Sequence, residues 1–182
     1  MHFSAALLAL AATVSAIDLR SYTTTGCDGG WVGCLGINPG VCCVFSEGAG
    51  SGKLSVSVNA IPREWRIQAD AYTGGGCRYI ANQQNSNGNT DLCLTYSSRG
   101  DRTGSLYRFI GRKRAADESC PAEQPNGGKC EASVKADSVG LADGTVYNIS
   151  GLADEKVEEL VKIADTGAGA EEVPAEFQPL RR

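Results

Sequence analysis

The residues of this sequence best suited to chemistry are its eight cysteines, four of which lie in the stretch GCDGGWVGCLGINPGVCCVF at positions 26–45. Cysteines can hold a metal, carry out redox chemistry or form disulfides. A zinc site needs Cys-x2-Cys spacing or histidine partners, and neither is present. The spacing therefore favours a disulfide frame over a metal site. The candidates are Cys27, Cys34, Cys42, Cys43, Cys77, Cys93, Cys120 and Cys130.

Histidine is almost absent, since His2 is the only one in the chain. Its position near the amino terminus excludes a Ser-His-Asp or Cys-His nucleophile and a histidine-ligated zinc centre in the mature protein. A carboxylate-pair glycosidase is the enzyme that could still be built, although no pair stands out. We therefore expect no enzyme and no cofactor. The acids weighed for the glycosidase alternative are Glu47, Glu64, Asp70, Asp91 and Asp101.

Residues 1–16, MHFSAALLALAATVSA, have the form of a secretory signal peptide. An apolar run from Phe3 to Val14 ends in small residues suited to signal peptidase, and it is too short to span a bilayer. Removal of this segment also removes His2. We expect a secreted, extracellular protein with no transmembrane segment, in a compartment where cysteines oxidise. The connectivity stays open, although Cys120 and Cys130 are close enough in sequence to close a short loop.

The chain divides into two segments of opposite charge. Residues 17–114 carry 11 basic and 7 acidic residues, a net charge of +4, whereas residues 115–182 carry 6 and 14, a net charge of −8. The cluster Arg112-Lys113-Arg114 marks the junction. It resembles a dibasic processing site, but a solvated basic loop explains it equally well. Processing would make the chain a toxin precursor whose acidic segment masks the basic one until cleavage after Arg114.

The first segment reads as a cysteine-rich β module. Alternation in Leu54–Val58 predicts a strand with one buried face, and further strands are expected at 65–69, 78–81, 92–96 and 105–110. A preceding strand is expected around Cys43–Phe45. Glycine-rich turns separate the strands, and residues 82–91 are expected to form a long polar loop. The stretch 26–45 is expected to be loop-rich scaffolding pinned by disulfides.

Residues 115–168 are expected to form an acidic α+β appendage, followed by a flexible tail over 169–182. The hairpin arms are 132–139 and 145–149, and the second arm contains the glycosylation sequon Asn148-Ile149-Ser150. Asp154 is expected to be the N-cap of a helix that ends at Gly167. Its apolar stripe is expected to pack on the hairpin or the β module. The stripe consists of Val157, Leu160, Val161 and Ala164.

The stretch WRIQADAYTGGGC resembles a βγ-crystallin Greek-key motif, in which two aromatics and a glycine hold a folded hairpin. Here those residues are Trp65, Tyr72 and Gly74. The resemblance implies a Greek-key β-sandwich, but the calcium signature of that family is missing. The whole chain also resembles the small secreted cysteine-rich proteins of filamentous fungi, some of which are effectors.

We therefore predict a mainly β protein, a disulfide-stapled Greek-key (βγ-crystallin-like) β-sandwich with a small α+β C-terminal appendage and a loose tail. Its predicted function is that of a secreted, effector-like, non-catalytic interaction protein. The expected partner is a cell-wall glycan, a host protein or an anionic surface, and not a nucleic acid; a monomer is expected. Aromatic residues and arginines dominate binding surfaces. The candidate binding residues are Trp31, Arg63, Arg66, Tyr72, Arg78 and Tyr79.

Overall fold

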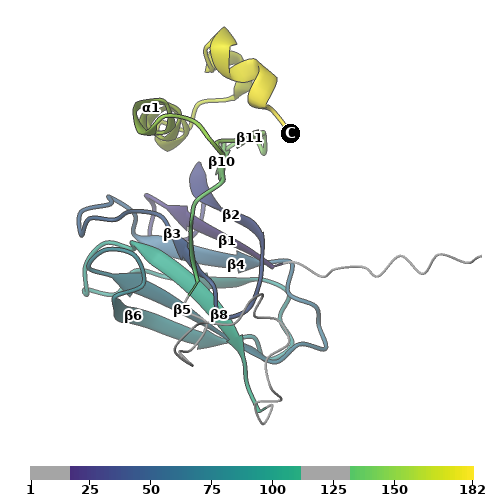
Figure 1. Ribbon diagram of the computed structural model, residues 1–182. Helices are drawn as coiled ribbons and strands as arrows, with labels where there is room; N and C mark the ends of the chain where they lie inside the picture. Colours follow the sequence, from purple (N-terminus) through teal and green to yellow (C-terminus); the bar gives the residue numbers. More distant parts are fainter. Residues whose placement is uncertain (1–16, 112–131) are drawn as a thin grey trace, which may run out of the picture.

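The computed structural model describes residues 17–111 and 132–182 (Figure 1). Three predictions lie outside these residues. They are the signal peptide at 1–16, the processing site Arg112-Lys113-Arg114, and the cysteines Cys120 and Cys130.

Two β-sheets stack on one another as a sandwich, which confirms the prediction of a mainly β, sandwich-like fold (Figure 1). The first sheet has the order β11-β10-β2-β1-β4-β7, and the second has the order β6-β5-β8-β3-β9. Described strand pairs are antiparallel except for β3 and β9, which run parallel. The Greek-key connectivity and the βγ-crystallin-like motif stay predictions. The ring partner of Trp65 is Phe109, at a centroid distance of 4.8 Å.

The bounds of the elements are as follows. The first sheet contains β1 (Ile17–Tyr22), β2 (Trp31–Ile37), β4 (Ser55–Asn59), β7 (Leu92–Leu94), β10 (Ser138–Gly140) and β11 (Val146–Asn148). The second contains β3 (Cys42–Val44), β5 (Ile67–Thr73), β6 (Tyr79–Asn85), β8 (Gly104–Phe109) and β9 (Ser133–Lys135). The helices are α1 (Asp154–Asp165) and the 3-10 helices η1 (Ala170–Glu172) and η2 (Ala175–Leu180).

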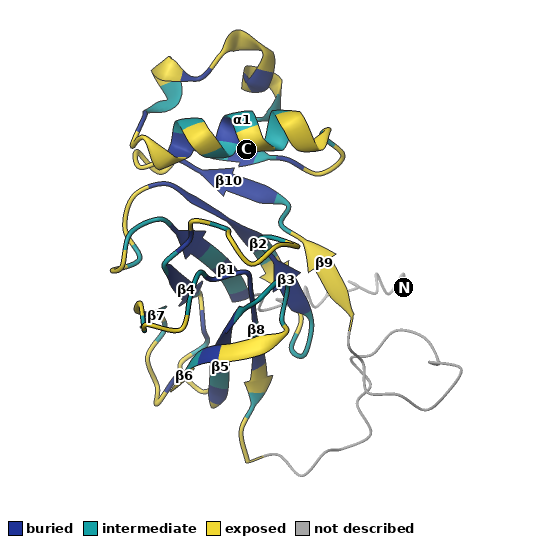
Figure 2. Ribbon diagram, turned by 90° about the vertical axis from the view of Figure 1, so that its left-hand side faces the viewer, coloured by how far each residue is buried: buried dark blue, intermediate teal, exposed yellow. Residues whose placement is uncertain are grey.

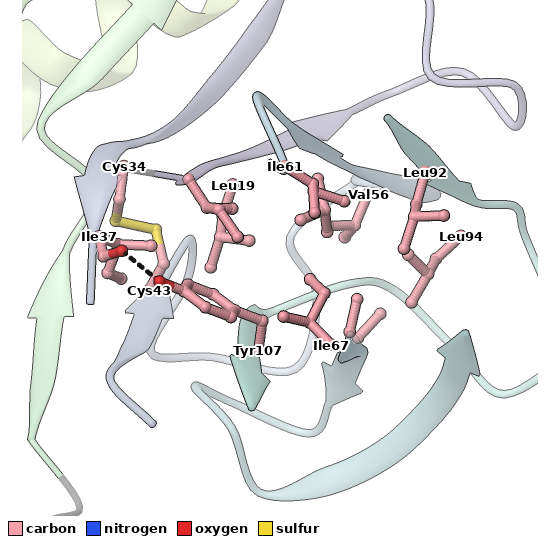
Figure 3. Packing of buried hydrophobic residues seen from close by; sticks show 14 residues of the cluster. Leu19, Cys34, Ile37, Cys43, Val56, Ile61, Ile67, Leu92, Leu94 and Tyr107 are labelled. Carbon is pink, nitrogen blue, oxygen red and sulfur yellow. Dashed lines mark hydrogen bonds between the residues drawn. A yellow bond between two sulfur atoms is a disulfide. The ribbon is translucent and has the colours of Figure 1, made fainter. Parts of the chain in front are cut away.

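The main core lies between the two sheets, where alternate residues of facing strands meet (Figure 3). Val56 and Val58 of β4 are fully buried there, as the alternation in the sequence predicts, and so is Ile67 of β5. Ser55 and Ser57, on the face of β4 expected to be open, are buried too. Tyr107 of β8 is buried too, and its hydroxyl donates to the carbonyl oxygen of Ile37 at 3.0 Å. Burial raises the pKa of the Tyr107 hydroxyl, so it stays a neutral donor.

Three disulfides form among the cysteines in the described part of the chain: Cys27–Cys93, Cys34–Cys43 and Cys42–Cys77. This confirms the prediction of a disulfide-bonded protein. The adjacent residues Cys42 and Cys43 point to opposite faces of β3, because successive side chains alternate along a strand. Cys43 therefore reaches across the core to β2 in the other sheet, while Cys42 holds the turn that follows β5.

The cysteine-rich stretch is more regular than expected. Residues 31–37 form β2, which lies between β1 and β10 in the first sheet and is largely buried. Gly33 is needed there because a Cβ atom would collide with the carbonyl oxygen of Leu19. This glycine serves close strand packing rather than flexibility, and composition alone hides the difference. Similarly, β6 extends to Asn85, into the stretch expected to be a loop.

The C-terminal segment supplies strands to both sheets. β9 pairs with β3 in the second sheet, whereas β10 pairs with β2 in the first and also forms the expected hairpin with β11. Residues 132–139 are thus two short strands rather than one hairpin arm. A chain that changes sheets in this way ties residues 132–182 into the sandwich.

Helix α1 packs across the hairpin and β2, and it forms a second apolar cluster (Figure 2). Leu160 and Ala164, two residues of the expected stripe, are its buried residues. The expected N-cap is wrong by one residue: Ala153 is the N-cap and makes no side-chain cap hydrogen bond. Asp154 is instead the first residue of the helix, where its negative charge interacts favourably with the positive end of the helix dipole.

The tail expected over 169–182 is ordered rather than loose. Phe177 and Val173 are buried in the second cluster, with exposed fractions of 1% and 5%. Arg181 forms a β-bridge with Tyr147, and the backbone N–H of Arg182 donates to the carbonyl oxygen of Val146 at 2.9 Å. Prolines and acids suggested a solvated tail, but the two buried side chains and these backbone contacts hold it against the second cluster and β11.

Candidate interaction surface

Of the five exposed large apolar side chains in residues 17–111 and 132–182, three gather at one edge of the second sheet. Tyr79 and Ile80 lie on β6, the edge strand, and are 59% and 42% exposed. Tyr96, which is 42% exposed, lies in the segment that follows β7. We call this region, with its two arginines, the edge surface. It consists of Arg78, Tyr79, Ile80, Tyr96 and Arg99.

Hydrogen bonds hold the segment 95–99 against β6. Asn82 Nδ2 donates to the carbonyl oxygen of Thr95 at 3.1 Å, and Ser97 Oγ donates to that of Ala81 at 3.2 Å. Arg99 Nη1 donates to the carbonyl oxygen of Ile80 at 3.4 Å. Tyr96 is therefore brought to the same sheet edge as Tyr79, although the two are far apart in sequence.

Tyr79 is exposed yet firmly positioned. Its ring lies against Gly74, whose φ of 87° is unfavourable for residues with side chains, and a Cβ atom there would approach Tyr79 Cδ2 to 2.6 Å. The Arg78 guanidinium lies 5.5 Å from the centroid of the Tyr79 ring. The disulfide Cys42–Cys77 fixes the backbone one residue before Arg78. A ring held in this way loses little conformational entropy when a partner binds.

Arg102 supports the Tyr96 side of the surface from within. Its guanidinium is fully buried, lies 5.4 Å from the centroid of the Tyr96 ring, and donates to the carbonyl oxygen of Gly100 and to Ser97 Oγ. Its Nε has no hydrogen-bond partner in the described chain. Burial lowers the pKa of Arg102, because desolvation disfavours its charge. Arg102 thus holds the segment 97–100 through its hydrogen bonds, and its charge loses its hydration in doing so.

The two exposed arginines of the edge surface, and the buried Arg102 beneath it, have no ion-pair partner in the described chain. Elsewhere Arg20 pairs with Asp18, Lys53 with Asp165 and Arg108 with Asp70, at 2.7–2.9 Å. Across residues 17–111 and 132–182, no carboxylate lies within 4.0 Å of the guanidinium groups of Arg78, Arg99 and Arg102. The edge surface therefore carries positive charge that the protein does not neutralise by direct pairing.

The six binding candidates from the sequence occupy different environments. Trp31 and Tyr72 are 5% and 8% exposed and so do not form part of an open surface; each belongs to a strand whose neighbours cover it. Arg63 and Arg66 are exposed near the start of β5, and Arg66 lines a shallow hollow of about 250 Å³. Arg78 and Tyr79 lie together at the other end of the β5–β6 hairpin. The sequence offered no signal for Ile80, Tyr96 and Arg99.

Asp70 is the most unusual acid among the glycosidase candidates, because it is fully buried. Desolvation raises the pKa of its carboxyl, against the opposing effects of a hydrogen bond from Gln83 at 2.7 Å and the cation of Arg108 at 2.9 Å. The hydrogen bonds of Asp91 and Asp101 are likewise with groups that are not acids: Asn59 and Thr90 for Asp91, and the backbone N–H of Gly52 for Asp101. No group of three or more His, Cys, Asp or Glu residues there could hold a metal ion.

Asn148 of the glycosylation sequon lies on β11, where its side-chain oxygen accepts the backbone N–H of Ser150 at 3.0 Å. Its side chain is partly exposed, and glycosylation stays a prediction. Within the described residues, no helix is long and apolar enough to cross a membrane.

Comparison with known proteins places the chain in a family. A protein called "uncharacterized secreted protein" from Arthroderma benhamiae is 27% identical over 176 residues, which cover 94% of this chain and 88% of the relative. No solved structure matches. The secreted relative and the three disulfides identify this chain as a secreted, extracellular protein. The N-terminal domain model ARB_05566_N matches residues 18–137 and the C-terminal domain model ARB_05566_C matches residues 142–182, so the chain belongs to the ARB_05566 family.

Proposed function

We propose that this secreted protein acts without catalysis and binds an extracellular polysaccharide through the edge surface. The observation that carries the proposal is the gathering of exposed Tyr79, Ile80 and Tyr96 with two arginines along β6. Tyrosine and arginine are enriched among the residues that dominate binding energy. An effector-like role, in which the polysaccharide belongs to another organism, is part of the same prediction.

A polysaccharide fits the shape of this surface. The phenol rings offer apolar faces on which the C–H groups of sugar rings can stack, while each hydroxyl can still hydrogen-bond. The rings lie along a strand edge rather than in a deep pocket, which suits an extended chain better than a small molecule. The fixed position of Tyr79 against Gly74 adds preorganisation.

Two alternatives receive less support. A glycosidase needs two carboxyl groups flanking the substrate, whereas Asp70 is buried and bonded to Gln83, Tyr72 and Arg108. A toxin precursor needs an acidic segment that detaches after cleavage. Here β9 and β10 belong to the two sheets, so separation would break strand pairs as well as the ion pair between Lys53 and Asp165.

The test is a binding assay against immobilised polysaccharides, both neutral and acidic, with purified protein whose disulfides are intact. The variants are Tyr79→Ala and Tyr96→Ala, and the matched control is Val134→Ala, because Val134 is 43% exposed on β9 at the opposite edge of the sheet. We expect each tyrosine variant to bind about tenfold more weakly, and the control to bind as the wild type does. Absence of binding to any polysaccharide would refute the proposal. Capture of host proteins alone would refute it too.

A further inference from the structure

We infer that the edge surface recognises an acidic polysaccharide, one whose sugars carry carboxylates, as in uronic acids. This inference rests on the proposed function and specifies its ligand class. It follows from the charge at the surface rather than from its tyrosines, which would stack equally well on neutral sugars.

The exposed guanidinium groups have unused donors. A guanidinium carries five N–H donors in a planar arrangement that matches a carboxylate, with which it forms two parallel hydrogen bonds. Arg99 uses Nη1 for the carbonyl oxygen of Ile80, and in the described chain Arg78 makes its contact with the ring of Tyr79. Arg78 directly precedes the exposed Tyr79 in the chain, and Arg99 follows the exposed Tyr96 by three residues. Each pair can hold the ring of a sugar and the carboxylate on it.

Arg102 adds to the positive potential without reaching the ligand. Its charge is buried beside the Tyr96 ring, where the low dielectric screens it less than water would. The neighbouring acid, Asp101, accepts a hydrogen bond from the backbone N–H of Gly52 at 2.7 Å and forms no ion pair in the described chain. An anion that approaches Tyr96 therefore meets a cation whose charge is only partly compensated.

The arrangement favours an acidic sugar polymer over other anions. A phosphate or a lipid headgroup could pair with the arginines, but it would leave the exposed parts of the Tyr79 and Tyr96 rings without a partner. A carboxylated sugar offers both an apolar ring face and an anion within one unit. A polymer repeats that unit, so Arg78–Tyr79 and Tyr96–Arg99 can each engage one.

The experiment measures binding to polygalacturonate and to polyglucuronate, each compared with its methyl ester. The ester keeps the sugar rings and removes the charge, which makes it a matched ligand control. The protein variants are Arg78→Gln and Arg99→Gln. Arg63→Gln is the control, because Arg63 is also exposed and unpaired in the described chain but precedes β5, at the end of the strand away from Tyr79.

We expect at least one acid polymer to bind about tenfold more tightly than its ester, and each of Arg78→Gln and Arg99→Gln to lose about fivefold in affinity for it. Sodium chloride should weaken this binding by screening, and Arg63→Gln should behave as the wild type. Equal affinity for acid and ester would overturn the inference and leave the proposed function standing. Absence of binding to any polysaccharide would overturn both. Tighter binding to anionic vesicles or nucleic acid than to either polymer would overturn the inference as well.

Discussion

Phe177→Ala tests whether the C-terminal residues belong to the folded core. Phe177 lies on η2, is 1% exposed, and packs in the second cluster, which also contains Leu160 and Val173. Removing a buried phenylalanine costs the lost burial of the ring and leaves a cavity, together about 3–5 kcal/mol in protein cores. Because η2 can relax partly into the cavity, we expect a loss of about 3 kcal/mol in the free energy of unfolding.

The assay is equilibrium unfolding in guanidinium chloride, followed by tryptophan fluorescence with the disulfides intact. Trp31 is a suitable reporter because it pairs with Gly140 of β10 and its ring lies against that glycine. Val134→Ala is the control, because Val134 is exposed, and substitutions of that kind change stability by about 0.5 kcal/mol or less. A loss below about 1 kcal/mol for Phe177→Ala would show that the tail contributes little to the core and would refute the reasoning.

Two further predictions concern buried charges. Asp165→Asn should lower the free energy of unfolding by about 3 kcal/mol, because it leaves the charge of Lys53 without its partner. The Lys53 side chain is only 4% exposed, and its Nζ lies 2.7 Å from the Asp165 carboxylate. A loss below about 0.5 kcal/mol in the unfolding measurement would mean that the pair behaves as an ordinary surface ion pair. The raised pKa of Asp70 means that the folded state holds this proton more tightly than the unfolded state, whose reference pKa is 3.8. Its contribution to stability is therefore fully present below the unfolded pKa and is lost as the pH rises through the folded pKa. Unfolding measured against pH in the wild type and Asp70→Asn checks this, since the wild type should lose stability relative to the variant over that window, and parallel curves would contradict it.

The strands with clear alternation were predictable from the sequence. Val56 and Val58 face the core as their spacing indicates, and β4, β5, β6, β7 and β8 form near the expected positions. The strand β2 was missed because its glycines read as loop, whereas Gly33 is required by the close approach of Leu19. Phe177 was missed for a related reason. A short apolar contact can anchor a segment whose average composition is polar and acidic.

The edge surface was only half predictable. Arg78 and Tyr79 stand out by residue type, but types alone also selected Trp31 and Tyr72, which are buried. Tyr96 joins the surface through hydrogen bonds between β6 and the segment 95–99, which follows β7 in the other sheet. Local sequence carries no record of such pairing. The surface became visible only when exposure and neighbours were known together.

In the folded protein, residues 132–182 of the acidic C-terminal segment do not cover the basic edge surface. Opposite net charges suggested that the acidic segment masks the basic one. In the structure, Lys53–Asp165 is an ion pair between the two segments, while α1 with its glutamates lies beyond the first sheet and β6 forms the far edge of the second (Figures 1 and 2). In the described part of the chain, the ion pairs of the α1 acids are with lysines, and none of them is with Arg78 or Arg99. A protein that is acidic overall can in this way present a basic, aromatic surface to an acidic polymer.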